Sequence, residues 1–274
     1  MRAAGWRAAG WREAVGRALV GGAALLLAWA GGPARAGGEL APGFPEVVAR
    51  VKASVVGVGT LAPLRVPRVQ VRGTGFAVAD GRHVVTNLHV LPEVLDVEQQ
   101  ERLAVFLPGE PPQPRLARRV AADREHDLAL LRISDAPLPA LPLGDSERVR
   151  EGELYAFTGF PLGSILGLYP VTHRALVAAV TPVATPVEQA RSLDPALIRR
   201  LRDPYPVFQL DATAYPGNSG SPLYDPATGA VVGVLNKVFV AAGRERALSE
   251  PSGISFAIPA RHVRALLERA GLEP

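Results

Sequence analysis

Downstream of Pro45, short runs of apolar and β-branched residues alternate with segments rich in Gly, Pro and Asp. Runs of this length, bounded by turn-forming residues, are typical of β-strands. Many short strands separated by turns favour a sandwich or a barrel, so the pattern predicts an all-β fold. The expected strands are 53–60, 73–79, 83–87, 103–107, 127–133, 153–160, 175–182, 207–212, 230–240 and 254–258.

Helical periodicity is found mainly at the end of the chain. Within 260–271, apolar residues recur at the i, i+3, i+4 and i+7 positions after a proline, which predicts an amphipathic helix. A proline-rich, then polar stretch at 133–152 divides the strands into two sets. A long proline-flanked insertion at 182–206 interrupts the second set, and a connection of that length is usually functional or disordered.

The first 36 residues have the three parts of a secretory signal. An arginine-rich segment, 1–17, precedes an apolar run, 18–30, and Ala34-Arg35-Ala36 offers a small-x-small cleavage site. The apolar run is shorter than the roughly 20 residues of a membrane-spanning helix. We therefore expect export to the periplasm or the medium, a mature domain at 37–274 and no stable membrane span after cleavage. An uncleaved anchor or an amphipathic helix is the alternative.

The composition excludes several kinds of chemistry. The chain has no cysteine, so disulfides, thiol nucleophiles and thiolate metal sites are absent. Its net charge of +4 comes almost wholly from scattered arginines, because Lys52 and Lys237 are its only lysines. No nucleic-acid-binding motif accompanies these arginines. We expect no nucleic-acid partner, no metal and no cofactor.

Hydrolysis by a serine requires a base, a carboxylate that orients the base, and backbone N–H donors for the oxyanion. His89 alone among the five histidines stands in a recognisable setting, at the end of the expected strand in "HVVTNLHV". Asp127 begins the apolar strand "DLALLRI". Neighbouring strand residues face opposite sides, so His126 does not face the site if Asp127 does. Asp123 is the nearest alternative carboxylate.

The segment "AYPGNSGSPLYD", 214–225, supplies a candidate nucleophile, Ser219. Gly217 allows a tight turn in which its own amide and that of Ser219 converge on one side. These N–H groups would form an oxyanion hole, a device whose donors each lower the barrier by about 3–4 kcal/mol. Asn218 completes the backbone of the candidate hole, and its side chain is expected to point outward.

The order "TNLHV", "DLALLRI", "PGNSGSPL" resembles the trypsin-like serine peptidases, specifically their cysteine-free bacterial HtrA/Deg branch. "GTGFAV", "FTGFPLG" and "GISFAIPA" match further family motifs in the same order. The resemblance implies two six-stranded antiparallel β-barrels, at about 45–140 and 150–258, followed by a C-terminal α-helix at about 260–271. It also implies an active site in the cleft between the barrels, with His89, Asp127 and Ser219 as the catalytic residues.

The chain also departs from that branch. Ser221 stands where the branch usually has Gly, and "GNSGSP" occurs in staphylococcal-type glutamyl endopeptidases. Ala214 and Leu235 replace the threonine and histidine with which those enzymes recognise glutamate, so glutamate specificity is disfavoured. That branch usually has one or two PDZ domains after the protease domain, and we expect none here.

The expected substrate pocket has two walls, formed by 213–215 and by 235–237. No acid stands six residues before Ser219, where specificity for Arg or Lys would place one, so the resemblance implies a small or medium apolar P1 residue. Lys237 faces solvent or biases a subsite toward acidic side chains. The pocket residues are Thr213, Ala214, Tyr215, Leu235, Asn236 and Lys237.

Three functions were compared. An α/β-hydrolase esterase is disfavoured, because its motif requires Gly at position 221 and its order is Ser, acid, His. A catalytically silent or resting relative would bind peptides or act as a chaperone. The sequence favours an exported serine endopeptidase that acts on unfolded or peptide substrates, and it leaves homo-oligomerisation open.

Overall fold

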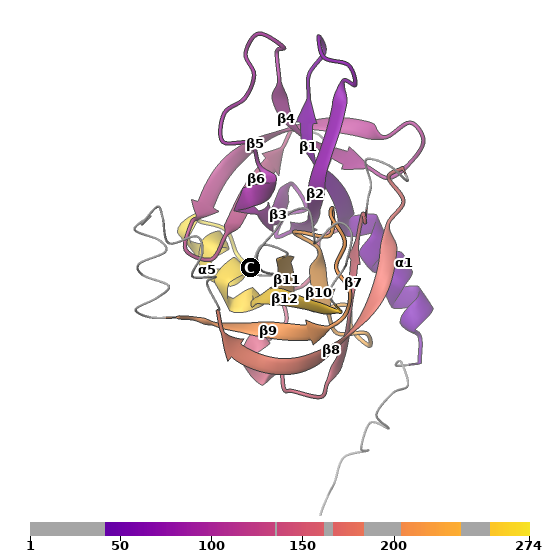
Figure 1. Cartoon of the computed structure of the whole chain (residues 1–274), viewed down its shortest axis with the longest axis vertical. Helices are drawn as coiled ribbons and strands as arrows, with labels where there is room; N and C mark the ends of the chain where they lie inside the picture. Colours follow the sequence, from indigo (N-terminus) through magenta and orange to yellow (C-terminus); the bar gives the residue numbers. More distant parts are fainter. Residues whose placement is uncertain (1–41, 135, 162–166, 184–203, 237–252) are drawn as a thin grey trace, which may run out of the picture. The chain divides into compact units, whose positions relative to one another are not determined.

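The computed structural model describes residues 42–134, 136–161, 167–183, 204–236 and 253–274. Its strands form two closed, six-stranded antiparallel barrels, which confirms the predicted fold class (Figure 1). The expected signal at 1–36, most of the insertion at 182–206, and Lys237 lie outside the described residues. No helix of the described part is long and apolar enough to cross a membrane.

The first barrel has the strand order β1-β2-β3-β6-β5-β4 and the second has the order β10-β11-β12-β9-β8-β7. The first contains β1 (Val55–Leu61), β2 (Val69–Val78), β3 (His83–Asn87), β4 (Arg102–Leu107), β5 (Gln113–Asp123) and β6 (Leu128–Ile133). The second contains β7 (Leu154–Gly159), β8 (Val171–Pro182), β9 (Pro206–Asp211), β10 (Pro222–Tyr224), β11 (Val231–Asn236) and β12 (Ile254–Pro259).

The two barrels share one apolar core. One buried cluster belongs to the first barrel and another to the second, whereas the largest cluster joins Phe76 and Phe106 of the first barrel to Phe160 and Tyr224 of the second. Strand β7 lies against β1 and β2, and β11 lies against β3. Burial of apolar side chains at this junction therefore fixes the position of one barrel on the other.

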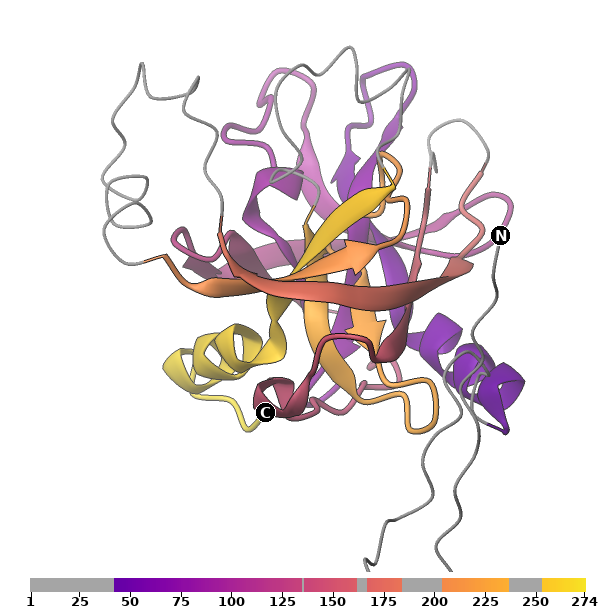
Figure 2. The same ribbon diagram turned by 60° about the horizontal axis from the view of Figure 1, so that its bottom comes forward.

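Two helices flank the barrels on opposite sides, as Figures 1 and 2 show. The predicted C-terminal helix is observed as α5 (Ala260–Arg269). The sequence did not predict α1 (Phe44–Ser54), which begins after Gly43 with Pro45 in its first turn. Its buried Val47 and Val51 pack into the shared core.

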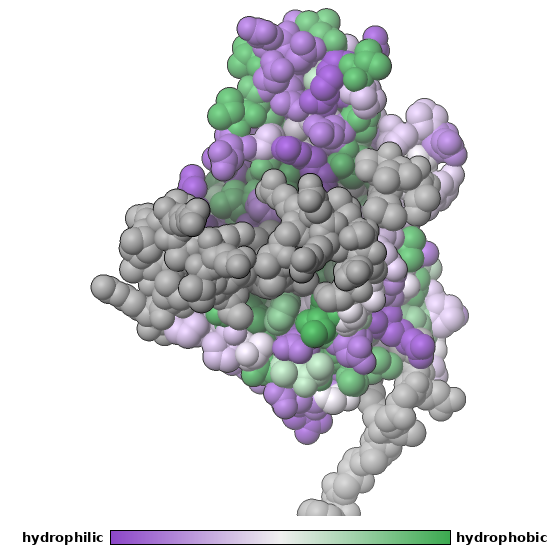
Figure 3. Space-filling view, viewed as in Figure 1, coloured by the Kyte–Doolittle hydropathy of each residue, from purple (hydrophilic) through white to green (hydrophobic). Residues whose placement is uncertain are grey.

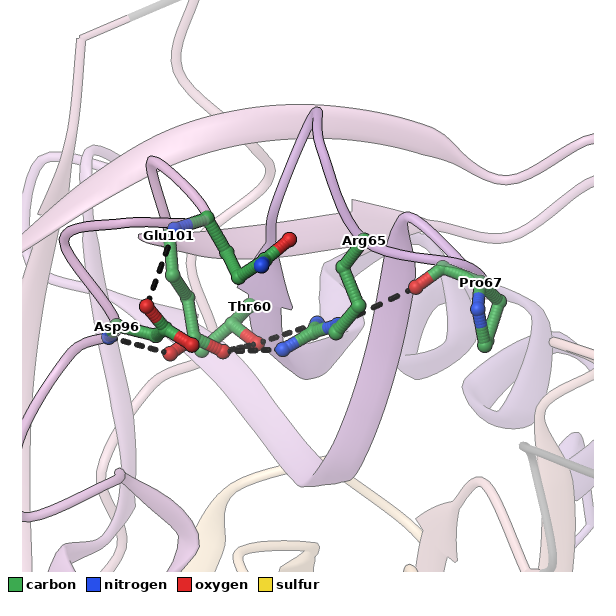
Figure 4. A network of polar contacts seen from close by, with 6 residues as sticks. Thr60, Arg65, Pro67, Asp96 and Glu101 are labelled. Atoms are coloured by element: carbon green, nitrogen blue, oxygen red, sulfur yellow. Dashed lines mark hydrogen bonds and ion pairs between the residues drawn. The ribbon is translucent and has the colours of Figure 1, made fainter.

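A polar network joins two loops at one end of the first barrel (Figure 4). The carboxylate of Glu101 accepts hydrogen bonds from the Thr60 hydroxyl, the Arg65 guanidinium and the Asp96 amide. Hydrogen bonds from the Asp96 amide and the Thr60 hydroxyl lower the pKa of Glu101 to about 2. Burial of the carboxylate opposes this shift but is the smaller effect. The ionised carboxylate therefore holds both loops together.

These loops carry apolar side chains into solvent. Leu64 and Val66 are exposed on one loop, and Val94 and Val97 are exposed on the other. Figure 3 shows green apolar atoms interspersed with purple polar ones over this end of the first barrel. Hydrogen bonds to Glu101, and not burial of these apolar side chains, therefore hold the two loops together.

Candidate active site

Strand pairing brings His89 and Asp127 together. Antiparallel pairing of β3 with β6 places Asn87, the last residue of β3, opposite Leu128, the first residue of β6. His89 follows in a short 3₁₀ turn, Leu88–Val90, and Asp127 immediately precedes β6. Two residues separated by 38 positions in the chain therefore meet at one end of the first barrel.

Asp127 holds His89 at two points. Its Oδ2 accepts a hydrogen bond from His89 Nδ1 at 2.6 Å, and its Oδ1 accepts one from the His89 backbone N–H at 2.9 Å. This contact leaves Nε2 as the ring nitrogen directed away from the carboxylate. A histidine held in this way can take up a proton at Nε2 while the carboxylate stabilises the resulting positive charge.

The backbone of Asp127 adopts a strained conformation. Its φ is 52°, in the left-handed region that aspartate tolerates better than most residues, at a cost of about 1–3 kcal/mol. Its carbonyl accepts hydrogen bonds from the Leu88 N–H at 3.0 Å and from the Asn87 side chain at 3.2 Å. These bonds offset the strain and fix the direction of the carboxylate.

Asn236 contributes a third hydrogen bond to the Asp127 carboxylate, and it does so from the second barrel. Its Nδ2 donates to Asp127 Oδ2 at 2.7 Å, and the residue is fully buried at the end of β11. The sequence analysis assigned Asn236 to a pocket wall and missed this contact. No local sequence signal reveals it, because it depends on how the barrels pack.

The loop before Ser219 forms a β-turn over residues 215–218. The Asn218 N–H donates to the Tyr215 carbonyl at 3.0 Å, and Gly217 has a φ of 99°. Pro216 at the second position and a positive φ at the third define a type II turn, whereas the third residue of a type I turn has a φ of about −90°. The two types differ in the orientation of the central peptide, which here carries the Gly217 N–H.

The three backbone N–H groups of the candidate oxyanion hole differ in whether they are already hydrogen-bonded. The Asn218 N–H is used within the turn itself. The N–H groups of Gly217 and Ser219 donate to no group within the described ranges. These two N–H groups are thus available to bind an oxyanion, whereas that of Asn218 is engaged.

The side chain of Asn218 does not point outward as expected. Asn218 is fully buried, so that expectation is wrong. Its amide atoms and the Ser221 hydroxyl have no hydrogen-bond partner among the described residues. A Cβ at Gly159 would collide with the Ser221 hydroxyl and lie 3.0 Å from Asn218 Oδ1, so this strand end requires glycine.

Ser219 lies in the same loop, 6% exposed. Within the described part of the chain, its hydroxyl makes no hydrogen bond to the His89 ring. Hydrogen bonds between nucleophile and base are often long without substrate and shorten in the complex. The arrangement therefore offers a serine, an oriented imidazole and two unused N–H groups at the junction of the barrels.

The expected pocket residues divide into two groups. Ala214 and Leu235 are buried in the core of the second barrel. Thr213 and Tyr215 line a cavity of about 510 Å³ together with His173, Arg174 and Asp211. Burial in the wall of that cavity lowers the pKa of His173.

Comparison with known proteins agrees with this fold. A family model described as a trypsin-like peptidase domain matches residues 73–234, so the chain belongs to the trypsin-like peptidase family. It is similar to members of the HtrA and DegP type. A probable periplasmic serine endoprotease DegP-like of Halomonas elongata is 31% identical over 188 residues, 68% of this chain and 32% of the relative.

The mitochondrial serine protease HTRA2 of Bos taurus is 33% identical over 265 residues, covering 90% of this chain and 50% of that protein. The chain thus spans half or less of the length of these relatives. Among solved structures, the HtrA-type protease AlgW in complex with a tripeptide has a TM-score of 0.59 at 23% identity, covering 83% of this chain and 63% of that chain. The Rv3671c protease of M. tuberculosis, in an inactive form, has the same score and identity and is covered to 98%.

Proposed function

We propose that this chain is an exported serine endopeptidase in which Ser219 is the nucleophile, His89 the general base and Asp127 the carboxylate that orients His89. The observation that carries the proposal is the two-point contact of Asp127 with His89, 2.6 and 2.9 Å, and the type II turn before Ser219, which leaves two N–H groups unused, supports it. Membership in the trypsin-like peptidase family supports the same reaction.

The reaction begins when Ser219 Oγ attacks the carbonyl carbon of a peptide bond and His89 Nε2 takes the hydroxyl proton. The N–H groups of Gly217 and Ser219 stabilise the oxyanion of the tetrahedral intermediate. His89 then gives the proton to the leaving nitrogen, the C–N bond breaks, and an acyl-serine ester remains. A water molecule, deprotonated by His89, hydrolyses the ester and restores Ser219.

A serine-reactive phosphonate tests the nucleophile. We expect the folded wild type to be labelled on Ser219 and to cleave unfolded proteins, and Ser219→Ala to do neither, with a loss of kcat of about 10⁶-fold. Intact-mass spectrometry and a peptide-cleavage assay measure the two effects. A folded wild type that binds peptides without labelling or cleavage would instead establish the peptide-binding or chaperone function.

The substrate preference is proposed to be a small or medium apolar P1 residue. The uncharged Thr213 supports this, since it occupies the position at which an acid would select Arg or Lys. Cleavage-site profiling with a proteome-derived peptide library, with Ser219→Ala as the control, should enrich such residues at P1. A preference for Arg, Lys or Glu would contradict the assignment.

Export is supported by the names of the DegP-like relatives, which describe them as periplasmic. Fractionation of producing cells and N-terminal sequencing of the purified protein test it. We expect the protein outside the cytoplasm with a mature N-terminus near Gly37, and a cytoplasmic chain that begins at Met1 would overturn the proposal. Unfolded or peptide substrates are the proposed partners.

A further inference from the structure

Thr74 of β2 connects the first barrel directly to the nucleophile loop. Thr74 is fully buried and is the second residue of the motif "GTGFAV". Its backbone N–H donates to the Ser219 carbonyl at 2.8 Å, and its hydroxyl donates to the Gly217 carbonyl at 2.7 Å. One residue therefore holds the nucleophile loop at two points.

Both contacts of Thr74 are made with residues of the candidate oxyanion hole. Gly217 and Ser219 are the residues whose N–H groups are unused in the described structure, and theirs are the two carbonyls that Thr74 binds. Anchoring the carbonyl of a residue restricts rotation of the peptide that follows it. The peptide after Gly217 joins it to Asn218, which closes the type II turn. The two anchored peptides carry the N–H groups of Asn218 and Gly220, so the contacts of Thr74 hold the backbone directly after each free N–H group and restrict the conformations of Gly217 and Ser219.

The Thr74 hydroxyl has its proton position determined by a second neighbour. It accepts a hydrogen bond from the Phe160 N–H at 3.1 Å, so its own proton is directed at the Gly217 carbonyl. Phe160 lies in "FTGFPLG", another segment that the reaction itself does not use. The hydroxyl therefore joins three sequence motifs, one from the first barrel and two from the second.

The surrounding glycines permit this close approach. A Cβ at Gly220 would collide with the Thr74 carbonyl and lie 2.6 Å from the Thr86 hydroxyl. A Cβ at Gly73 would lie 2.9 Å from the Ser219 carbonyl. Both distances are shorter than real Cβ contacts, so the loop can lie this close to β2 only with glycine at these positions.

We infer that Thr74 is a positioning residue of the oxyanion hole, and that its hydroxyl keeps the Tyr215–Asn218 turn in the type II form that directs the Gly217 N–H toward the substrate. The inference rests on the proposed peptidase function for its kinetic consequence. Its structural consequence, an ordered loop, does not depend on activity. The two can therefore fail separately.

Thr74→Val tests the inference because it removes the hydroxyl at nearly constant volume. The Gly217 carbonyl and the Phe160 N–H then lose their partner, which is unfavourable in a buried site. We expect kcat to fall about 10- to 100-fold with KM changed less than about threefold, since an oxyanion donor acts mainly in the transition state. Affinity for a peptide boronate, whose adduct places an oxygen in the hole, should fall by the same factor as kcat/KM.

Two variants serve as controls. Thr74→Ser retains the hydroxyl and should stay within about threefold of the wild-type kcat. Thr158→Val removes another fully buried hydroxyl, which bonds to Thr172 and Tyr224 away from the loop, so it should lower stability and leave kcat unchanged. If Thr74→Val does not fold, Thr74→Cys replaces it, because a thiol is a much weaker donor.

Hydrogen exchange of peptides covering 214–221, followed by mass spectrometry, gives the readout that needs no activity. We expect faster exchange in this segment of Thr74→Val and unchanged exchange in Thr158→Val. Equal exchange and an unreduced kcat in Thr74→Val would overturn the inference, as would a kcat for Thr74→Ser as low as that of Thr74→Val. Faster exchange in Thr74→Val than in a wild type that hydrolyses nothing would refute the peptidase and retain the positioning contact.

Discussion

Of the three His–Asp pairs in the described part of the first barrel, two have the same hydrogen-bond pattern, whereas His83 contacts Asp80 through its ring. In the pair His89–Asp127 and in the pair His126–Asp123, the histidine donates its backbone N–H to one carboxylate oxygen and its Nδ1 to the other. The ring contacts measure 2.6 and 2.9 Å. Hydrogen-bond geometry alone therefore does not distinguish a catalytic pair from a structural one.

The surroundings of the two pairs differ in charge and exposure. Asp127 accepts a hydrogen bond from the neutral side-chain amide of Asn236, whereas Asp123 accepts one from the Arg269 guanidinium at 2.7 Å. The side chain of His89 is 32% exposed. The ring of His126 is stacked on that of His262, with centroids 3.7 Å apart.

Under the proposed function, this difference assigns proton transfer to His89 and Asp127. The positive charge of Arg269 already compensates the negative charge of Asp123. Asp123 would therefore stabilise a positively charged imidazole less strongly than an uncompensated carboxylate does. Although burial opposes it, the hydrogen bonds from His126 and Arg269 lower the pKa of Asp123 below its usual range. The neutral amide of Asn236 orients Asp127 without compensating its charge, which stays available to His89.

Asp127→Asn should break the proposed catalytic pair. The substitution keeps the shape but favours the wrong tautomer of His89, so we expect kcat to fall about 10⁴-fold. Asp123→Asn is the matched variant, and it should lower the melting temperature while leaving kcat within about threefold. Peptide hydrolysis and calorimetry of both variants measure the contrast. Equal losses of kcat would show that the two pairs are not functionally distinct.

Asn236→Ala should weaken the catalytic pair without removing it. A hydrogen bond to a charged group contributes about 1.5 kcal/mol or more, so loss of the orienting amide should reduce kcat about tenfold. Arg269→Ala removes the third partner of the other pair, and it should lower the free energy of unfolding with no change in kcat. If Asn236→Ala retains the full kcat, Asp127 needs no support from the second barrel.

His262→Phe should change only the pH dependence of stability. Burial, followed by the charges of His126 and Arg261, lowers the pKa of His262 from 6.5 to about 3, against the opposing charge of Asp123. Between these values the unfolded chain binds a proton that the folded chain does not, so the free energy of unfolding falls as pH decreases. Phenylalanine retains the ring stack and removes this term.

Calorimetry from pH 7 to pH 4 should therefore show a smaller drop in melting temperature for His262→Phe than for the wild type. Unfolding is the appropriate measurement, because hydrolysis also depends on His89 as the base. Parallel curves for the two proteins would mean that His262 has the same pKa in the folded and unfolded chains.

The sequence predicted the elements with a clear apolar pattern, whether they are fully buried or amphipathic. β3 was predicted at its observed bounds, and α5 was predicted with an end two residues beyond the observed one. β5 was not predicted, because its residues are mostly exposed or half-buried and it includes several arginines, so pairing with β4 and β6 holds it in place. β10 has only three residues, too few to give a pattern. α1 was missed because its valines resemble a short strand.

The site was predictable where residues neighbour each other in the chain or on paired strands. The positions of His89 and Asp127 at adjacent strand ends follow from a turn and an apolar run. The hydrogen bond from Asn236 and the contacts of Thr74 could not be predicted, since they join residues of different barrels. The burial of Asn218 likewise depends on the space beside Gly159, which no local pattern encodes.

Because the hydrogen bond between Asn236 and Asp127 joins the two barrels, the order of synthesis determines when the site is complete. The ribosome delivers the first barrel, with His89 and Asp127, well before Ser219 and the end of β11 are made, and domains fold as units from the N-terminal side. A partly synthesised chain therefore has neither the nucleophile nor the amide that hydrogen-bonds the Asp127 carboxylate. Under the proposed function, the chain would become able to cleave proteins, itself included, only after its second half has emerged and docked.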